Sequence, residues 1–173
     1  MPVIENPIQE DRLAFTFPMG AQSSKYDAWS HYRNQFNSAF GGTKAVDMVY
    51  ATADTAWLIE VKDYRVNPRT KAIDLADEVA LKVRDTLAGL VSARLHANDP
   101  DEKRLADALL RKRHLRVVLH LETPPSFSRL QPKSIETSTV LQKLKQLIRS
   151  IDPHPCVVDQ YTITPVMSWA VQG

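Results

Sequence analysis

The stretch from residue 45 to residue 62, AVDMVYATADTAWLIEVK, decides the fold. Two runs rich in branched and aromatic residues, 45–51 and 56–62, flank a short polar segment. This pattern predicts an antiparallel β-hairpin whose turn is centred between Ala53 and Asp54. Apolar residues occupy most positions of both runs, so we expect the two strands to be buried.

The register of this hairpin places three charged residues, Asp47, Glu60 and Lys62, on one face, because strand side chains alternate with a period of two. Asp47 then faces Glu60, with Cβ atoms roughly 4.5–5.5 Å apart. Two buried carboxylates need a cation or a raised pKa, and Lys62 supplies only one positive charge. A divalent metal would complete the balance, since Mg²⁺ is held by one or two carboxylates with water and phosphate oxygens. A slip of one residue would separate the pair.

The segments around the hairpin alternate between strand and helix patterns. Their order, β-α-ββ-α(α)-β-α-β, predicts an α/β fold, a three-layer sandwich with a central mixed β-sheet. The chain forms one domain over 1–173, with an irregular lead-in over 1–11. The expected elements are a strand at 13–17, helices at 24–40, 72–97, 101–113 and 134–150, and strands at 116–121 and 157–163.

Composition limits the class of protein. The chain has 173 residues, of which 43% are hydrophobic and 24% charged, which suffices for one cored domain. Five Gly and one Cys exclude collagen-like and disulfide-scaffold proteins. There is no apolar run of membrane length and no secretory leader, which predicts a cytoplasmic location without membrane contact.

Charge is distributed unevenly along the chain. The net charge is +2, from 22 basic and 20 acidic residues. Residues 1–60 hold 4 basic and 7 acidic side chains, whereas residues 61–173 hold 18 and 13. The basic excess therefore follows the hairpin, which suits an acidic partner such as nucleic acid without requiring one.

The charged residues of the hairpin resemble the motif of the PD-(D/E)xK nuclease superfamily, which has the restriction-endonuclease-like fold. Asp47 is followed by 12 residues and then by Glu60-Val61-Lys62, and Val46 stands where the family usually has proline. The resemblance implies that Asp47, Glu60 and the Val61 backbone carbonyl bind Mg²⁺ or Mn²⁺. It implies that Lys62 orients the attacking water or stabilises charge on the phosphate.

The activity implied by this resemblance is metal-dependent endonucleolytic hydrolysis of phosphodiester bonds. DNA is favoured over RNA as the substrate, in defence against foreign DNA or in repair. A homodimer or a larger complex would supply target recognition, since one small domain leaves little chain for it. The alternative is a non-enzymatic α/β subunit, or a degenerate nuclease fold, that binds nucleic acid or protein. In that case the hairpin carboxylates form only a surface ion pair, and the basic C-terminal part docks the partner.

Further polar residues near the hairpin are candidates for contact with nucleic-acid phosphates. They are Lys25 and Tyr26 at the start of the first helix, and Tyr64, Arg65, Arg69 and Lys71 after the second strand. An ordinary polar loop explains the second group equally well. The basic run at 111–116 suits a helix C-terminus better than a binding site. The aromatic stripe over 29–40 suits the core.

Overall fold

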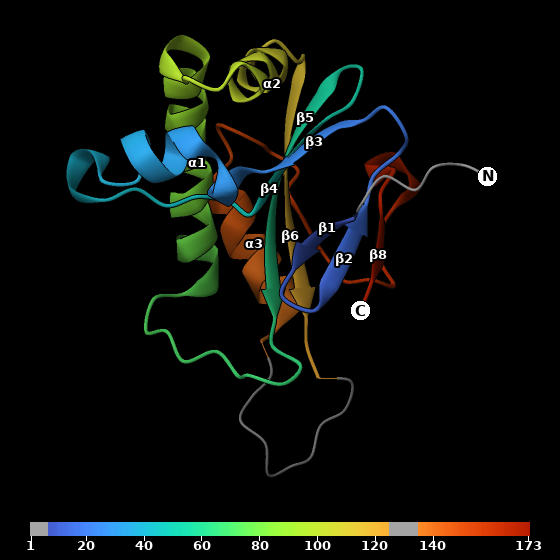
Figure 1. Ribbon diagram of the computed structural model, residues 1–173. Helices are drawn as coiled ribbons and strands as arrows, with labels where there is room; N and C mark the ends of the chain where they lie inside the picture. The colour runs from blue at the N-terminus through green and yellow to red at the C-terminus, as the bar shows by residue number, and fades with distance from the viewer. Residues whose placement is uncertain (1–6, 125–134) are drawn as a thin grey trace.

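The predicted hairpin lies at the centre of a five-stranded mixed sheet (Figure 1). The computed structural model describes residues 7–124 and 135–173. The sheet order is β3(Gln22–Lys25), β4(Met48–Ala51), β5(Thr55–Asp63), β6(His114–Glu122) and β7(Cys156–Val158). The pairs β3–β4 and β4–β5 are antiparallel, whereas β5–β6 and β6–β7 are parallel. The prediction of an α/β fold with a mixed sheet is confirmed.

The register of the hairpin agrees with the sequence pattern. Val49 pairs with Leu58 and Ala51 pairs with Ala56. Strand β4 begins at Met48, so Asp47 lies just before the ladder, on the same side of the chain as Val49. The polar turn and the branched residues on both sides were sufficient to define this register locally.

Two different layers cover the two faces of this sheet (Figure 1). The helices α1(Leu75–His96), α2(Pro100–Leu110) and α3(Thr137–Leu147) cover one face. A second sheet covers the other face and consists of β1(Ile8–Glu10), β2(Leu13–Thr16) and β8(Ala170–Gln172). The fold therefore has three layers, but one outer layer is an antiparallel sheet.

Alternate residues of the central strands divide the core between these layers. Val49 and Leu58 pack with the helices. Tyr50, Trp57 and Ile59 pack with the small sheet. Because Glu60 is two residues from Leu58, its side chain lies on the helix face, as does that of Lys62. The charged part of the hairpin is thus covered by α1.

The segment 26–41 does not form the single helix that its aromatic spacing predicts. It contains three short turns, η1(Tyr26–Ala28), η2(Tyr32–Phe36) and η3(Ala39–Gly41). The Ser24 hydroxyl accepts a hydrogen bond from Trp29 Nε1 instead of capping a helix. Tertiary contacts of the aromatic side chains override the helical pattern: Trp29 is buried, whereas Phe40, in a left-handed turn, is 93% exposed.

Other boundaries are shorter than predicted. The last predicted strand, 157–163, is reduced to β7, because the Asp159 carboxylate accepts the amides of Tyr161 and Thr162 and turns the chain. Part of the predicted lead-in forms β1, and residues 1–6 lie outside the described residues. None of the described helices has the length and apolar character needed to cross a membrane.

At Gly89, helix α1 packs closely on η1 and η2. A Cβ atom there would overlap the Tyr26 hydroxyl and crowd the Phe36 ring. The Tyr26 hydroxyl has no hydrogen-bond partner among the described residues. We expect Gly89→Ala to lower the free energy of unfolding by about 1–3 kcal/mol through overpacking. Urea unfolding measures this change.

The matched control is Tyr26→Phe, which removes the hydroxyl that the new methyl group meets. The double variant Tyr26→Phe/Gly89→Ala should recover a large part of the lost stability, and Tyr26→Phe alone should not destabilise the chain. Equal destabilisation of Gly89→Ala with and without the tyrosine hydroxyl would contradict this packing.

Candidate functional site

Glu60 is the fully buried charge at the centre of the candidate site. Its Oε1 atom lies 2.6 Å from Lys62 Nζ and 2.5 Å from Lys82 Nζ. Lys62 comes from the same strand, and Lys82 comes from α1. Glu60 Oε2 is buried without a hydrogen-bond partner among the described residues. The two lysines together supply the compensation that Lys62 alone could not.

Asp47 lies beside this group and is held by the backbone. Its Oδ2 accepts a 2.6 Å hydrogen bond from the Val61 amide, and Lys82 Nζ lies 3.8 Å from its Oδ1. Two backbone contacts fix the segment: the Asp47 carbonyl accepts from the Tyr26 amide, and the Val46 amide donates to the Thr86 hydroxyl on α1. The predicted proximity of Asp47, Glu60 and Lys62 is thus produced by the hairpin together with α1.

The electrostatics of the pair follow from this burial. Burial, together with the nearby charge of Glu60, raises the pKa of Asp47 to about 7. Burial also opposes the charge of Lys62, but the Glu60 carboxylate outweighs it and raises the pKa of that lysine. Asp47 therefore gains and loses its proton near neutral pH, while Lys62 stays charged.

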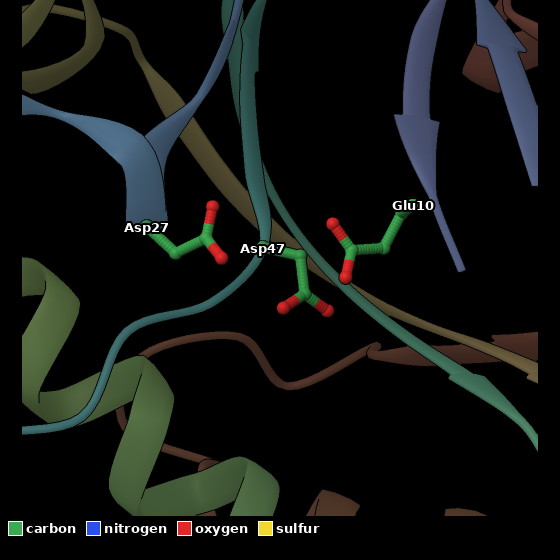
Figure 2. Close-up of side chains that lie close together, drawn as sticks. All are labelled: Glu10, Asp27 and Asp47. Atoms are coloured by element: carbon green, nitrogen blue, oxygen red, sulfur yellow. The ribbon is translucent and has the colours of Figure 1, made fainter.

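Two further carboxylates face Asp47. Oxygen atoms of Glu10, Asp27 and Asp47 all lie within 4.8 Å of one another (Figure 2). Glu10 comes from β1 in the small sheet and Asp27 from η1. Lys25 Nζ lies 2.6 Å from Glu10 Oε2, and burial raises the pKa of Asp27. Such a group of oxygen donors has the chemistry of a site for Mg²⁺ or Mn²⁺.

The structure places the two carboxylate metal ligands implied by the motif in different surroundings. Asp47 belongs to the group of three carboxylates, whereas Glu60 is engaged by Lys62 and Lys82. Val61 contacts Asp47 through its amide. A cation at Asp47 would have oxygen atoms of Glu10 and Asp27 within 4.8 Å. The two lysines hold Glu60 through Oε1, and its Oε2 has no hydrogen-bond partner among the described residues.

The predicted nucleic-acid contacts lie in different surroundings. Lys25 pairs with Glu10. Tyr26 is buried in the core against α1, so its side chain does not reach the surface. Arg65 forms a two-point ion pair with Asp63 and also donates to the Gly173 carbonyl.

The remaining predicted contacts line a cavity of about 380 Å³ next to Lys62. Arg69 Nη1 donates to the Tyr64 hydroxyl over 2.8 Å, and Arg69 Nη2 lies 2.7 Å from Glu78. Lys71 Nζ is 2.5 Å from the same carboxylate. Burial opposes the charge of Glu78, but hydrogen bonds from the two cations lower its pKa to about 2. The cavity therefore lies directly beside the charged group of the hairpin.

Sequence reasoning missed four members of the site. Lys82 and Glu78 lie on α1, and helical spacing brings them to one face, since they are four residues apart. Glu10 lies in a strand that the pattern leaves as lead-in. Asp27 lies in η1, in a segment whose spacing predicts one regular helix. Of these residues, only Glu78 and Lys82 could have been found from the sequence, because they are charged residues four positions apart on the helix that follows the acidic hairpin.

The raised pKa of Asp47 predicts a pH dependence of stability. Between pH 4 and 7 the folded chain keeps a proton that the unfolded chain releases, so stability falls as pH rises, by roughly 4 kcal/mol in all. We expect Asp47→Asn to remove this slope and to be more stable than the parent at pH 8. Urea unfolding at pH 5 and pH 8 measures it. Asp54→Asn, in the exposed hairpin turn, is the control and should keep the slope; an unchanged slope in Asp47→Asn would refute the assignment.

The role of Lys82 predicts a second effect on stability. Lys82→Met leaves the buried Glu60 with one cation, and we expect the free energy of unfolding to fall by about 1–3 kcal/mol. Adding Glu60→Gln to this variant should recover most of the loss, because the uncompensated charge disappears. Lys145→Met on the exposed side of α3 serves as the control. Equal stability of Lys82→Met and the parent in urea unfolding would contradict the ion pair.

The chain is similar to part of a protein from Neisseria meningitidis serogroup A / serotype 4A (strain DSM 15465 / Z2491) that is named cysteine–tRNA ligase. The two are 34% identical over 165 residues, and the match covers 78% of this chain and 24% of the ligase. The chain thus spans about a quarter of the length of the curated relative it matches. No family model and no solved structure matches the chain.

This similarity overturns the nuclease prediction. The relative is an enzyme by its name, but a ligase that acts on tRNA rather than an enzyme that cleaves DNA. The predictions of a nuclease, an endonuclease and a DNA-binding protein in defence or repair are therefore wrong. The physical reason is that Asp47, Glu60 and Lys62 define a buried charge balance, which a lysine on α1 can complete as well as a metal can.

Proposed function

We propose that this chain is an α/β domain with a function related to that of a tRNA ligase, and that it binds tRNA through the cavity beside Lys62. The observation that carries the proposal is the cluster of cations at this cavity. Arg12, Lys62, Arg69 and Lys71 all line it. The similarity to a cysteine–tRNA ligase supports tRNA as the nucleic acid.

The charge of the cavity suits a phosphate backbone. RNA is bound mainly by lysine and arginine contacts to phosphate oxygens, which release counterions. Of the two acids in the lining, Asp63 is already paired with Arg65, which leaves Asp11 as the uncompensated one among the described residues. On the cationic side, Lys62 pairs with Glu60, and Arg69 and Lys71 share the single carboxylate of Glu78. The lining therefore keeps a modest excess of positive charge.

We also propose that the carboxylates near Asp47 hold a divalent cation, Mg²⁺ or Mn²⁺. Glu10, Asp27 and Asp47 would repel an approaching phosphate if they remained uncompensated. A bound divalent ion would offset most of this local negative charge and would offer a coordination position to a phosphate oxygen. The proposal concerns binding of tRNA, and no bond-making or bond-breaking step is assigned to these residues.

We infer in addition that the helix layer and central sheet follow the restriction-endonuclease-like arrangement. The hairpin followed by α1 and by the parallel strand β6 supports this inference. The small sheet formed by β1, β2 and β8 adds a layer to that arrangement.

Binding of the full chain to purified tRNA tests the proposed function. We expect fluorescence anisotropy to show saturable binding that weakens as salt rises and strengthens with millimolar Mg²⁺. Glu10→Gln/Asp27→Asn should lose the Mg²⁺ response while keeping the salt dependence. Lys145→Gln serves as a control for loss of one remote positive charge. Absence of tRNA binding, or tighter binding of duplex DNA than of tRNA, would overturn the proposal.

A further inference from the structure

We propose that the cavity beside Lys62 takes up one phosphorylated nucleotide from a single-stranded segment of RNA. This inference rests on the proposed function and specifies which part of an RNA the site recognises. It assigns to the cavity a ligand of one nucleotide unit, with the phosphate on the cationic side chains and the base on the Tyr64 side.

Three separate segments of the chain build the cavity. They are the turn between β1 and β2, the end of β5, and the loop that leads to α1. Its volume of about 380 Å³ lies within the range of small-ligand sites. The lining residues are Asp11, Arg12, Lys62, Asp63, Tyr64, Val66, Asn67, Pro68, Arg69, Thr70 and Lys71. A pocket assembled from two sheets and a loop presents a shaped recess rather than a flat basic patch.

The cations of the cavity differ in how firmly they are held. Arg69 is fixed by the Tyr64 hydroxyl, the Ile73 carbonyl and Glu78. By contrast, Lys71 has 57% of its side chain exposed although it pairs with Glu78. Arg12 is exposed at the β1–β2 turn and makes no ion pair within the described ranges. The pocket thus combines a rigid wall with two cations that are accessible to an incoming anion.

The rigid wall also supplies a surface for a base. Arg69 holds the Tyr64 hydroxyl, so the orientation of the tyrosine ring is set before a ligand arrives. Aromatic rings stack on nucleobases regardless of base identity, and arginine planes do the same. Asn67 and Thr70 add hydrogen-bonding groups to the same lining. A wall that is already ordered loses little entropy on binding.

The shape of the site favours a single strand over a duplex. In a duplex the bases are stacked and paired, and its backbone lies on a convex surface. A recess of one-nucleotide size requires a nucleotide that can be turned out of the stack, as in a loop or at a strand end. The chemistry of the lining, with cations, an aromatic ring and an amide, matches such a unit.

The first test compares the binding of single-stranded RNA and of double-stranded RNA to the full chain. Fluorescence anisotropy should show that a labelled single-stranded RNA of ten nucleotides binds at least tenfold more tightly than the blunt duplex of the same sequence. Arg12→Gln and Lys71→Gln should each weaken binding of the single strand about tenfold. Arg113→Gln and Lys145→Gln, which remove exposed charges outside the cavity lining, should weaken it no more than about twofold.

The second test uses small competitors. Adenosine monophosphate should displace the labelled strand from the parent chain and from the control variants, whereas adenosine should not. Inorganic phosphate should displace it less well than the nucleotide does. Equal competition by inorganic phosphate and by the nucleotide would overturn the nucleotide assignment.

The outcomes separate this inference from the proposed function. Intact tRNA that binds with equal affinity to the parent, the cavity variants and the controls would refute the cavity while leaving tRNA binding in place. Equal affinity for the duplex and the single strand would also refute it. Failure of every RNA to bind would overturn both proposals.

Discussion

The compensation of one buried carboxylate, Glu60, governs how the layers of this protein meet. Glu60 lies on the central strand β5 with no exposed side-chain surface, between Lys62 of its own strand and Lys82 of α1. An uncompensated charge at this depth would cost several kcal/mol, so α1 must dock where Lys82 can reach the strand. The position of the longest helix is therefore coupled to a single acidic residue of the hairpin.

The same charge balance extends to the third layer. Asp47 lacks a full cationic partner, which is why burial and Glu60 raise its pKa to about 7. Glu10 brings a carboxylate from the small sheet to the same point (Figure 2). Uncompensated carboxylates thus lie near a cavity lined with cations. A divalent ion would balance the carboxylates, and a phosphate ligand would balance the cations.

The parts of the fold that the sequence predicts correctly depend on local patterns. The hairpin register follows from alternation over a few residues and a short turn. Helix α1 follows from the apolar periodicity over 72–97, and the structure starts it at Leu75, after the Asp74 cap. The helix prediction is wrong over 26–41 because burial of the Tyr26 and Trp29 side chains in the core outweighs the helical pattern of the segment. The strand predicted at 13–17 is β2, but the small sheet was missed, because β1 lies in the expected lead-in and β8 pairs with β2 from near the other end of the chain.

The sequence by itself determined that Asp47, Glu60 and Lys62 share one face of a buried hairpin, since period-two alternation leaves no other arrangement in that register. Only the tertiary structure decided what balances them. Lys82 reaches Glu60 from a helix, and Glu10 reaches Asp47 from a separate sheet. A motif of three charges is compatible with a metal or with a further lysine as the compensating cation. That choice is made by residues that are distant in sequence and meet only when the layers pack.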